Sequence, residues 1–68
     1  MPLLKRSFSL AGHRTSVALE PEFWAALEQA ASARRVNLSA LVAEVDAARS
    51  PGQKLASALR LIALQFRG

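Results

Sequence analysis

The clearest local pattern in the chain is an alternation of polar and apolar residues over positions 14–19, RTSVAL. Because successive side chains of a β-strand point to opposite faces, a period of two indicates a half-buried strand. The inner face would carry Thr15, Val17 and Leu19, and the outer face Arg14, Ser16 and Ala18. The Glu20-Pro21 pair then ends the strand, because proline has no amide hydrogen to donate to a sheet.

Apolar residues next recur with helical spacing, which predicts a first helix over about residues 21–34. Pro21 suits the first helical position, where its missing N–H is not needed. The apolar stripe of this helix consists of Phe23, Leu27, Ala30 and Ala31, flanked by Trp24.

Two further helices are predicted, over about residues 38–49 and 51–66. Asn37 is the expected N-cap of the second helix, and Ser50 and Gln53 have the spacing of a capping box for the third. The second helix has the stripe Leu38, Leu41, Val42 and Val45, and the third has Leu55, Ala58, Leu59, Ile62 and Phe66. The third helix is apolar over more than one face, which is typical of a helix that packs against both its own subunit and a partner.

Residues 1–12 lack a clear pattern apart from the short alternation Ser7-Phe8-Ser9-Leu10, which Ala11-Gly12 breaks. Two interpretations remain open, a flexible arm and an extra strand that turns at Gly12. The expected organisation is therefore this segment followed by one domain over residues 13–68.

Composition indicates how so small a domain is stabilised. A chain of 68 residues buries too little surface to be more than marginally stable alone, and it usually needs disulfides, a metal or oligomerisation. There is no cysteine and only one histidine, which argues against disulfides and a metal site. Since 51% of the residues are hydrophobic, burial between subunits is the expected support.

The formal net charge of +4 favours a polyanionic partner, either nucleic acid or an anionic membrane face. The distribution of charge along the chain is more informative than the net charge. Positions 1–19 contain Lys5, Arg6 and Arg14 and no acid, whereas the acids begin at Glu20 and fall on the predicted helices. Lys5 and Arg6 are either a solvated tail or an arm that follows the DNA backbone.

Several classes of function are disfavoured. We find no signal-peptide pattern and no apolar run near the roughly 20 residues that a membrane span needs, so a cytoplasmic location is expected. There is no paired-carboxylate arrangement, nucleophile motif or glycine-rich phosphate loop, so neither an enzyme nor a cofactor is expected.

A single strand followed by helices leaves backbone donors and acceptors unpaired along both edges. A second copy of the chain can supply the missing strand through a two-fold axis, which gives an antiparallel ribbon. Such a ribbon fits the major groove of B-DNA. The sequence thus predicts a mainly α fold with one N-terminal β-strand, which pairs antiparallel with the same strand of a second copy, and with an extra C-terminal helix.

The segment of residues 12–24, GHRTSVALEPEFW, resembles the strand-to-helix entry of ribbon-helix-helix DNA-binding proteins of the MetJ and Arc type. It is most similar to a short bacterial subfamily, which also has a Leu-Ser-Ala-Leu-Val second helix, here residues 38–42, and a C-terminal helix like residues 55–61. The resemblance implies a sequence-preferring homodimer that binds double-stranded DNA in the major groove and acts as a repressor or autoregulator.

The resemblance also implies roles for particular residues. Outward strand residues would read base edges, which maps onto Arg14, Ser16 and Ala18, although Ala18 can offer only a methyl contact. The start of the second helix, Asn37, Leu38 and Ser39, would hold a phosphate, with Lys5 and Arg6 as further phosphate contacts. The resemblance further implies an intertwined homodimer, whose expected core consists of Val17, Leu19, Phe23, Leu27, Leu41, Val42, Val45, Leu59 and Ile62.

An alternative function is that of an antitoxin or other protein-interaction module, because many relatives pair with a second protein through a C-terminal tail. Here the predicted third helix runs almost to Gly68, which disfavours such a tail. A membrane-surface role for residues 55–66 is the least favoured interpretation.

Overall fold

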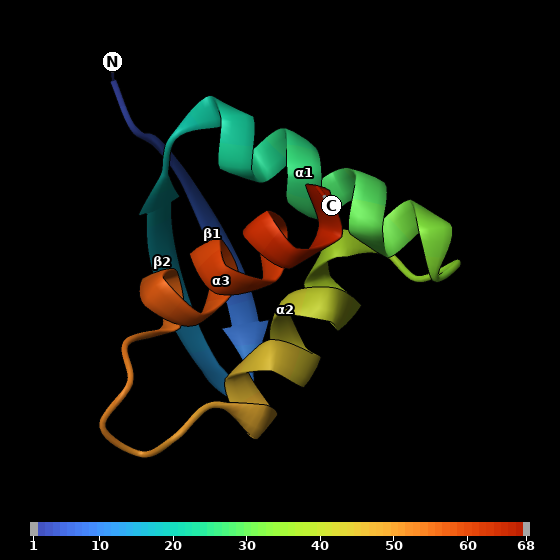
Figure 1. The fold of residues 1–68 in the computed structure, drawn as a ribbon. Helices are drawn as coiled ribbons and strands as arrows, with labels where there is room; N and C mark the ends of the chain where they lie inside the picture. Colours follow the sequence, from blue (N-terminus) through green and yellow to red (C-terminus); the bar gives the residue numbers. More distant parts are fainter. Residues whose placement is uncertain (1, 68) are drawn as a thin grey trace.

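The structure, a computed structural model, describes the backbone of residues 2–67 and the side chains of residues 2–66. Figure 1 shows a β-hairpin that lies against a layer of three helices. The elements in chain order are β1 (Leu4–Leu10), β2 (His13–Leu19), α1 (Pro21–Ala33), α2 (Leu38–Ala48) and α3 (Leu55–Arg67). The predicted mainly helical fold with an N-terminal strand over residues 14–19 and an extra C-terminal helix is therefore confirmed.

The hairpin corrects one expectation from the sequence. β2 has a partner strand within its own chain. β1 pairs with it antiparallel along its whole length, from Leu4 opposite Leu19 to Leu10 opposite His13. The turn between the strands has positive φ at both central residues, Ala11 (50°) and Gly12 (82°), as a tight type I′ hairpin requires. Of the two interpretations left open for residues 1–12, the structure shows the strand that turns at Gly12.

This pairing removes one argument for a second copy. β1 supplies the hydrogen-bonding groups that a partner strand was expected to supply, at least along one edge of β2. A single chain does not show intertwining with another copy, so the homodimer stays a prediction.

The hairpin buries its inner face on the helices because both strands alternate in the same sense. Phe8 and Leu10 of β1 and Val17 and Leu19 of β2 are buried. The residues expected to form a dimer core lie in the core of one chain: Val17, Leu19, Leu27, Leu41, Val42, Val45 and Leu59 are buried, and Phe23 and Ile62 pack partly buried against them. Trp24, only 1% exposed, is among the largest fully buried side chains and belongs to this core.

The third helix begins later than the sequence pattern suggested, at Leu55 and not at residue 51. The carbonyl of Ser50 accepts a hydrogen bond from the amide of Gln53 (2.9 Å), so Pro51 and Gly52 occupy the central positions of a turn. The guanidinium of Arg49 donates to the carbonyl of Gln53 and holds the turn in place. The capping box predicted at Ser50 and Gln53 is therefore wrong.

The other helix boundaries agree closely with the sequence. Pro21 is at the start of α1, and the Asn37 side chain accepts from the amide of Ala40 (2.8 Å), which confirms it as the N-cap of α2. α3 has the expected second apolar face. Ala58, Leu59 and Ala63 are buried, whereas Leu61 and Leu64 are 51% and 52% exposed.

The end of α1 is closed by a Schellman motif. The Val36 amide donates to the Ala31 carbonyl (3.0 Å), and the Arg35 amide donates to the Ser32 carbonyl (3.0 Å). The motif needs a left-handed residue, and Arg35 fills this place with φ 60°. An L-residue in that conformation costs about 1–2 kcal/mol, which glycine avoids.

We expect Arg35→Gly to raise the free energy of unfolding by about 0.5–1 kcal/mol, because the relief of left-handed strain exceeds the extra freedom of glycine in the unfolded chain. Urea unfolding followed by circular dichroism measures the change. Ala25→Gly, at an exposed position in the interior of the same helix, is the matched control and should destabilise the protein. Loss of stability in both variants would contradict the conclusion that Arg35 is strained in its left-handed conformation.

Candidate nucleic-acid interface

The outer face of the hairpin forms one continuous polar surface, which we call the ribbon face. It consists of Lys5, Ser7 and Ser9 from β1 and Arg14, Ser16 and Ala18 from β2. Five of these side chains are exposed and Ala18 is partly exposed. The outward orientation predicted for the β2 residues is therefore correct.

The register fixes which residues of the ribbon face are neighbours. Lys5 lies opposite Ala18, Ser7 opposite Ser16, and Ser9 opposite Arg14. The hydroxyls of Ser7 and Ser16 are hydrogen-bonded at 3.0 Å. Sequence reasoning missed Ser7 and Ser9, although the alternation of residues 7–10 was the signal that could have placed them there.

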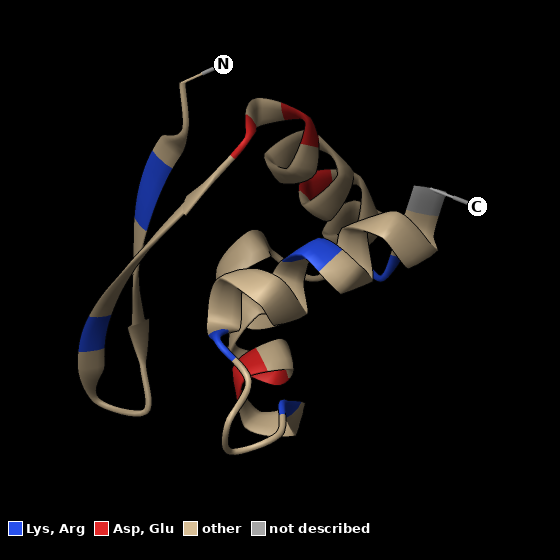
Figure 2. Ribbon diagram, turned by 60° about the vertical axis from the view of Figure 1, so that its left-hand side comes forward, with Lys and Arg blue, Asp and Glu red and all other residues tan. Residues whose placement is uncertain are grey.

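The cations of the ribbon face have no acid to neutralise them. Among the described side chains, neither Lys5 nor Arg14 forms an ion pair. Four other arginines are paired with acids: Arg6 with Glu28, Arg34 with Glu44, Arg49 with Asp46, and Arg60 with Glu20. Figure 2 shows basic positions toward both ends of the hairpin, and acidic positions on the helices and at the junction that leads into α1. The ribbon face therefore presents uncompensated positive charge to solvent.

Arg6 is placed differently from its neighbour Lys5. It lies on the inner face of β1, where its guanidinium is 5.1 Å from the ring centroid of Trp24 and 2.9 Å from a carboxylate oxygen of Glu28. These contacts join β1 to α1. They also pair the charge of Arg6 with groups of the same chain. Of the two N-terminal cations suggested for phosphate binding, the ribbon face contains only Lys5.

The start of α2 was the other expected phosphate site. Asn37 and Leu38 line a shallow groove that also contains Glu28 and Arg35 but none of the ribbon-face residues. In Figure 1, α2 begins beside the end of α1. The structure therefore does not join Asn37, Leu38 and Ser39 to the ribbon face, and a phosphate contact there stays a prediction.

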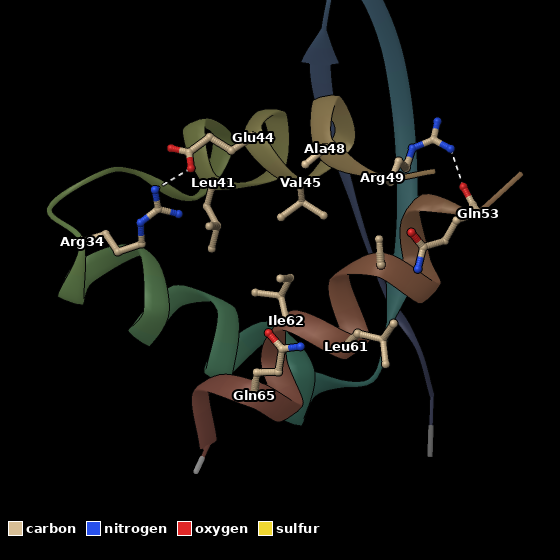
Figure 3. Close-up of a pocket in the computed structure, with 11 residues that line it drawn as sticks. Arg34, Leu41, Glu44, Val45, Ala48, Arg49, Gln53, Leu61, Ile62 and Gln65 are labelled. Atoms are coloured by element: carbon tan, nitrogen blue, oxygen red, sulfur yellow. Dashed lines mark hydrogen bonds and ion pairs between the residues drawn. The ribbon is translucent and has the colours of Figure 1, made fainter. Parts of the chain in front are cut away.

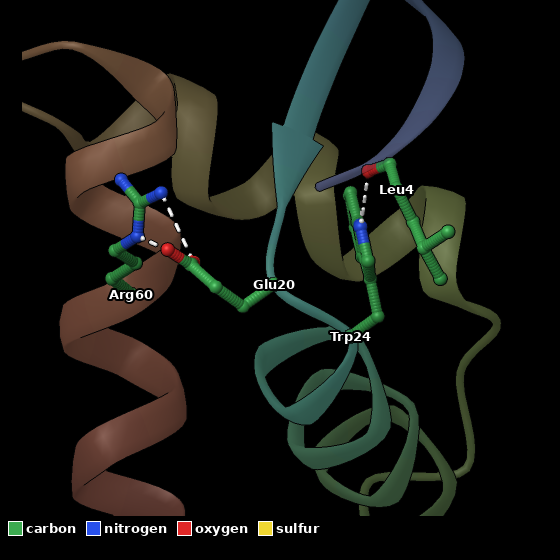
Figure 4. A network of polar contacts seen from close by, with 4 residues as sticks. All are labelled: Leu4, Glu20, Trp24 and Arg60. Carbon is green, nitrogen blue, oxygen red and sulfur yellow. Dashed lines mark hydrogen bonds and ion pairs between the residues drawn. The ribbon is translucent and has the colours of Figure 1, made fainter. Parts of the chain in front are cut away.

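An ion pair fixes the end of β2 to the helical layer. The Arg60 guanidinium contacts a carboxylate oxygen of Glu20 through Nη2 (3.1 Å) and Nε (3.2 Å), and it lies 5.7 Å from the ring centroid of Phe23 (Figure 4). On the other side of α1, the indole of Trp24 donates to the carbonyl of Leu4 (2.8 Å). The two contacts tie the adjacent ends of both strands to the helices and orient the ribbon face.

The environment of Glu20 lowers the pKa of its carboxyl group below the ordinary value of 4.5. A backbone hydrogen bond at Glu20 is the largest cause; desolvation opposes it, and the hydrogen bond and charge of Arg60 add to it. Because the folded state holds the proton less tightly than the unfolded chain, this carboxylate stabilises the fold above the unfolded pKa. The contribution is lost as the pH falls through the lowered pKa.

We therefore expect Glu20→Gln to reduce the loss of stability that accompanies acidification below about pH 4.5. Urea unfolding at a series of pH values from neutral to acid measures this dependence. Glu22→Gln removes a neighbouring carboxylate that forms no ion pair with a described side chain, so it is the matched control. An identical pH dependence in Glu20→Gln and the wild type would contradict the assignment.

The described residues contain neither a metal-binding cluster nor a membrane-spanning helix. Between residues 2 and 67, no three His, Cys, Asp or Glu side chains are grouped so that they could hold a metal ion. In the same range no helix combines the length and the apolar character that crossing a bilayer requires. The only histidine, His13, is exposed at the hairpin turn.

Comparison with known families agrees with the geometry. A model of the ribbon-helix-helix domain matches residues 3–66, a range that includes both strands and nearly all of α3. The chain therefore belongs to the ribbon-helix-helix family, whose domains are generally DNA-binding or regulatory and typically lack enzymatic activity. No curated protein and no solved structure matches the chain.

Proposed function

We propose that the protein binds double-stranded DNA by placing the ribbon face in the major groove, and that it acts as a transcriptional repressor or autoregulator. The observation that carries this proposal is the pair of unneutralised cations, Lys5 and Arg14, on the outer face of a two-stranded ribbon. The major groove admits a ribbon of this width, and its phosphates attract positive charge.

The side chains of the ribbon face suit base edges. Arg14 can donate two hydrogen bonds to the O6 and N7 atoms of a guanine, which is the commonest specific contact. Ser7 and Ser16 can each donate or accept, and Ala18 offers a methyl group to a thymine methyl. Lys5 places a second cation at the opposite end of the ribbon face from Arg14.

Affinity for a preferred duplex, selected from a random pool and measured by fluorescence anisotropy, should fall steeply with salt. A plot of the logarithm of the binding constant against the logarithm of the salt concentration should be linear, with a slope of about −0.9 per neutralised phosphate. We expect Arg14→Gln to weaken binding to the preferred duplex by about 1–3 kcal/mol and to affect unrelated duplexes less.

Lys54→Gln is the control, because it removes an exposed cation that forms no ion pair with a described side chain and lies outside the ribbon face. Its affinity for the preferred duplex should stay close to that of the wild type. Salt-independent binding, or an equal loss in the Arg14 and Lys54 variants, would contradict the proposal.

A second candidate function, a protein-interaction module, is favoured by a groove between α2 and α3. Figure 3 shows Leu41 and Val45 from α2 facing Ile62 from α3 across this groove, which Leu61 also lines. The exposed Leu64 continues the apolar surface along α3. Exposed apolar surface of this kind often marks a contact with another protein.

The double variant Leu61→Ser, Leu64→Ser separates the two functions. Because neither leucine belongs to the ribbon face, we expect the variant to keep the wild-type affinity for DNA in the anisotropy assay. Loss of DNA binding by the folded variant, checked by circular dichroism, would show that DNA binding requires this apolar face of α3.

A further inference from the structure

Within the described residues, the hairpin leaves one edge of β2 without a neighbouring strand. The sheet has only two strands, so β1 occupies one edge of β2 and the other edge is open. The two-residue turn makes Leu10 and His13 a hydrogen-bonded pair, and such pairs alternate with non-hydrogen-bonded ones along the hairpin. The backbone amides and carbonyls of Arg14, Ser16 and Ala18 therefore point away from β1, toward the open edge.

A second copy of the chain can occupy this edge. Ribbon-helix-helix domains generally bind DNA as dimers, and two identical strands pair antiparallel about a two-fold axis. The symmetric register that uses the free groups of Arg14, Ser16 and Ala18 places Ser16 opposite its own copy. Arg14 then lies opposite the partner's Ala18, so no like charges meet across the pair. The result is a four-stranded sheet with both β2 strands in the centre and a β1 strand at each edge.

The widths of this sheet and of the DNA groove separate the roles of the two strands. Neighbouring strands are about 4.8 Å apart, so the two β2 strands are about 5 Å apart and the two β1 strands about 14 Å apart. The major groove is about 12 Å wide. The β2 pair therefore fits between the two rows of phosphates that border the groove, whereas the β1 strands lie over these rows.

The residue types of the ribbon face match this separation. β2 contains Arg14, whose planar fork of donors suits a guanine edge. β1 contains Lys5, whose flexible stem ends in a compact charge that suits a phosphate. Ser7 and Ser9, the other outward residues of β1, have short hydroxyl groups that can donate to phosphate oxygens. All three outward side chains of β1 are exposed.

Building on the DNA binding proposed above, we propose that β1 is a phosphate-binding strand at each edge of the dimer's sheet. Lys5, Ser7 and Ser9 contact the DNA backbone on both sides of the major groove. Arg14 and Ser16 of both copies contact the bases between. β1 thus sets the affinity and orientation of the dimer, and β2 sets its sequence preference.

Lys5→Gln and Arg14→Gln should therefore weaken binding in different ways. Lys5→Gln should weaken binding to the preferred duplex and to unrelated duplexes by the same factor. Because each copy loses one phosphate contact, the salt slope of this variant should be less steep by about 1.8. Arg14→Gln should instead reduce the preference for the selected duplex. Fluorescence anisotropy over a salt series measures both effects, and Lys54→Gln, which removes an exposed cation outside the ribbon face, is the control.

Neutral methylphosphonates in the DNA locate the contact with the backbone. Placed at the phosphates that border the selected site, they should weaken binding by the wild type. The same duplex should weaken binding by Lys5→Gln less, because this variant has already lost the charge that the phosphates attract. Ser9→Ala should lower the affinity for all duplexes without changing the salt slope, since a hydroxyl group carries no charge.

Proline substitutions test which edge the second copy uses. Because the amide of Ala18 points away from β1, Ala18→Pro should leave the hairpin folded but prevent pairing at the open edge of β2. Ser9→Pro makes the same change on the open edge of β1 and should leave the dimer intact. Sedimentation velocity measures the oligomeric state, and circular dichroism confirms the fold. The Lys5 and methylphosphonate measurements need neither proline variant.

The possible failures are distinguishable. Three results would each overturn the role of β1 and leave DNA binding intact: loss of preference at particular base pairs in Lys5→Gln, a monomeric Ser9→Pro beside a dimeric Ala18→Pro, or one chain on the shortest duplex of full affinity in native mass spectrometry. Failure of the wild-type protein to bind any duplex would overturn the proposed function itself.

Discussion

The pairing of β1 with β2 is the interaction on which the rest of the structure depends. It satisfies backbone groups of both strands, and it gives the helices a two-stranded surface to cover. It also brings the N-terminal cation Lys5 onto the same face as Arg14. Without this pairing residues 4–10 would be an arm, and Lys5 would not lie on the ribbon face.

The distribution of charge follows from the alternation within the hairpin. Inward positions meet the helices, so Arg6 is held by Glu28 and by the ring of Trp24. Outward positions meet solvent, and their cations stay available for an external anion. The protein therefore neutralises charge where the layers meet and leaves it exposed on the ribbon, an arrangement that suits a nucleic-acid ligand.

Local signals in the sequence predicted much of this fold. The alternation of residues 14–19 gave the correct outer face, and Asn37 caps α2 as its type and position indicated. These signals act over a few residues, so a single sequence reveals them. The membership of Arg14, Ser16 and Ala18 in the exposed surface was predictable for the same reason.

Features that depend on a distant partner, or on a choice between two local structures, were not predictable. The alternation in β1 is short, and its turn has an alanine at positive φ, which turn preferences disfavour. Ser50 and Gln53 suit a capping box and a turn equally well, and the contact from Arg49 to the Gln53 carbonyl favours the turn. The opposite placement of Lys5 and Arg6 follows only once β1 is known to be a strand.

The position of Trp24 has a practical consequence. It is the only tryptophan in a chain without tyrosine, and its indole bonds the first residue of β1 while Arg6 lies over its ring. Detachment of the strand from the helices would break both contacts and admit water to the indole. Intrinsic fluorescence thus reports directly on docking of the hairpin, without an added label.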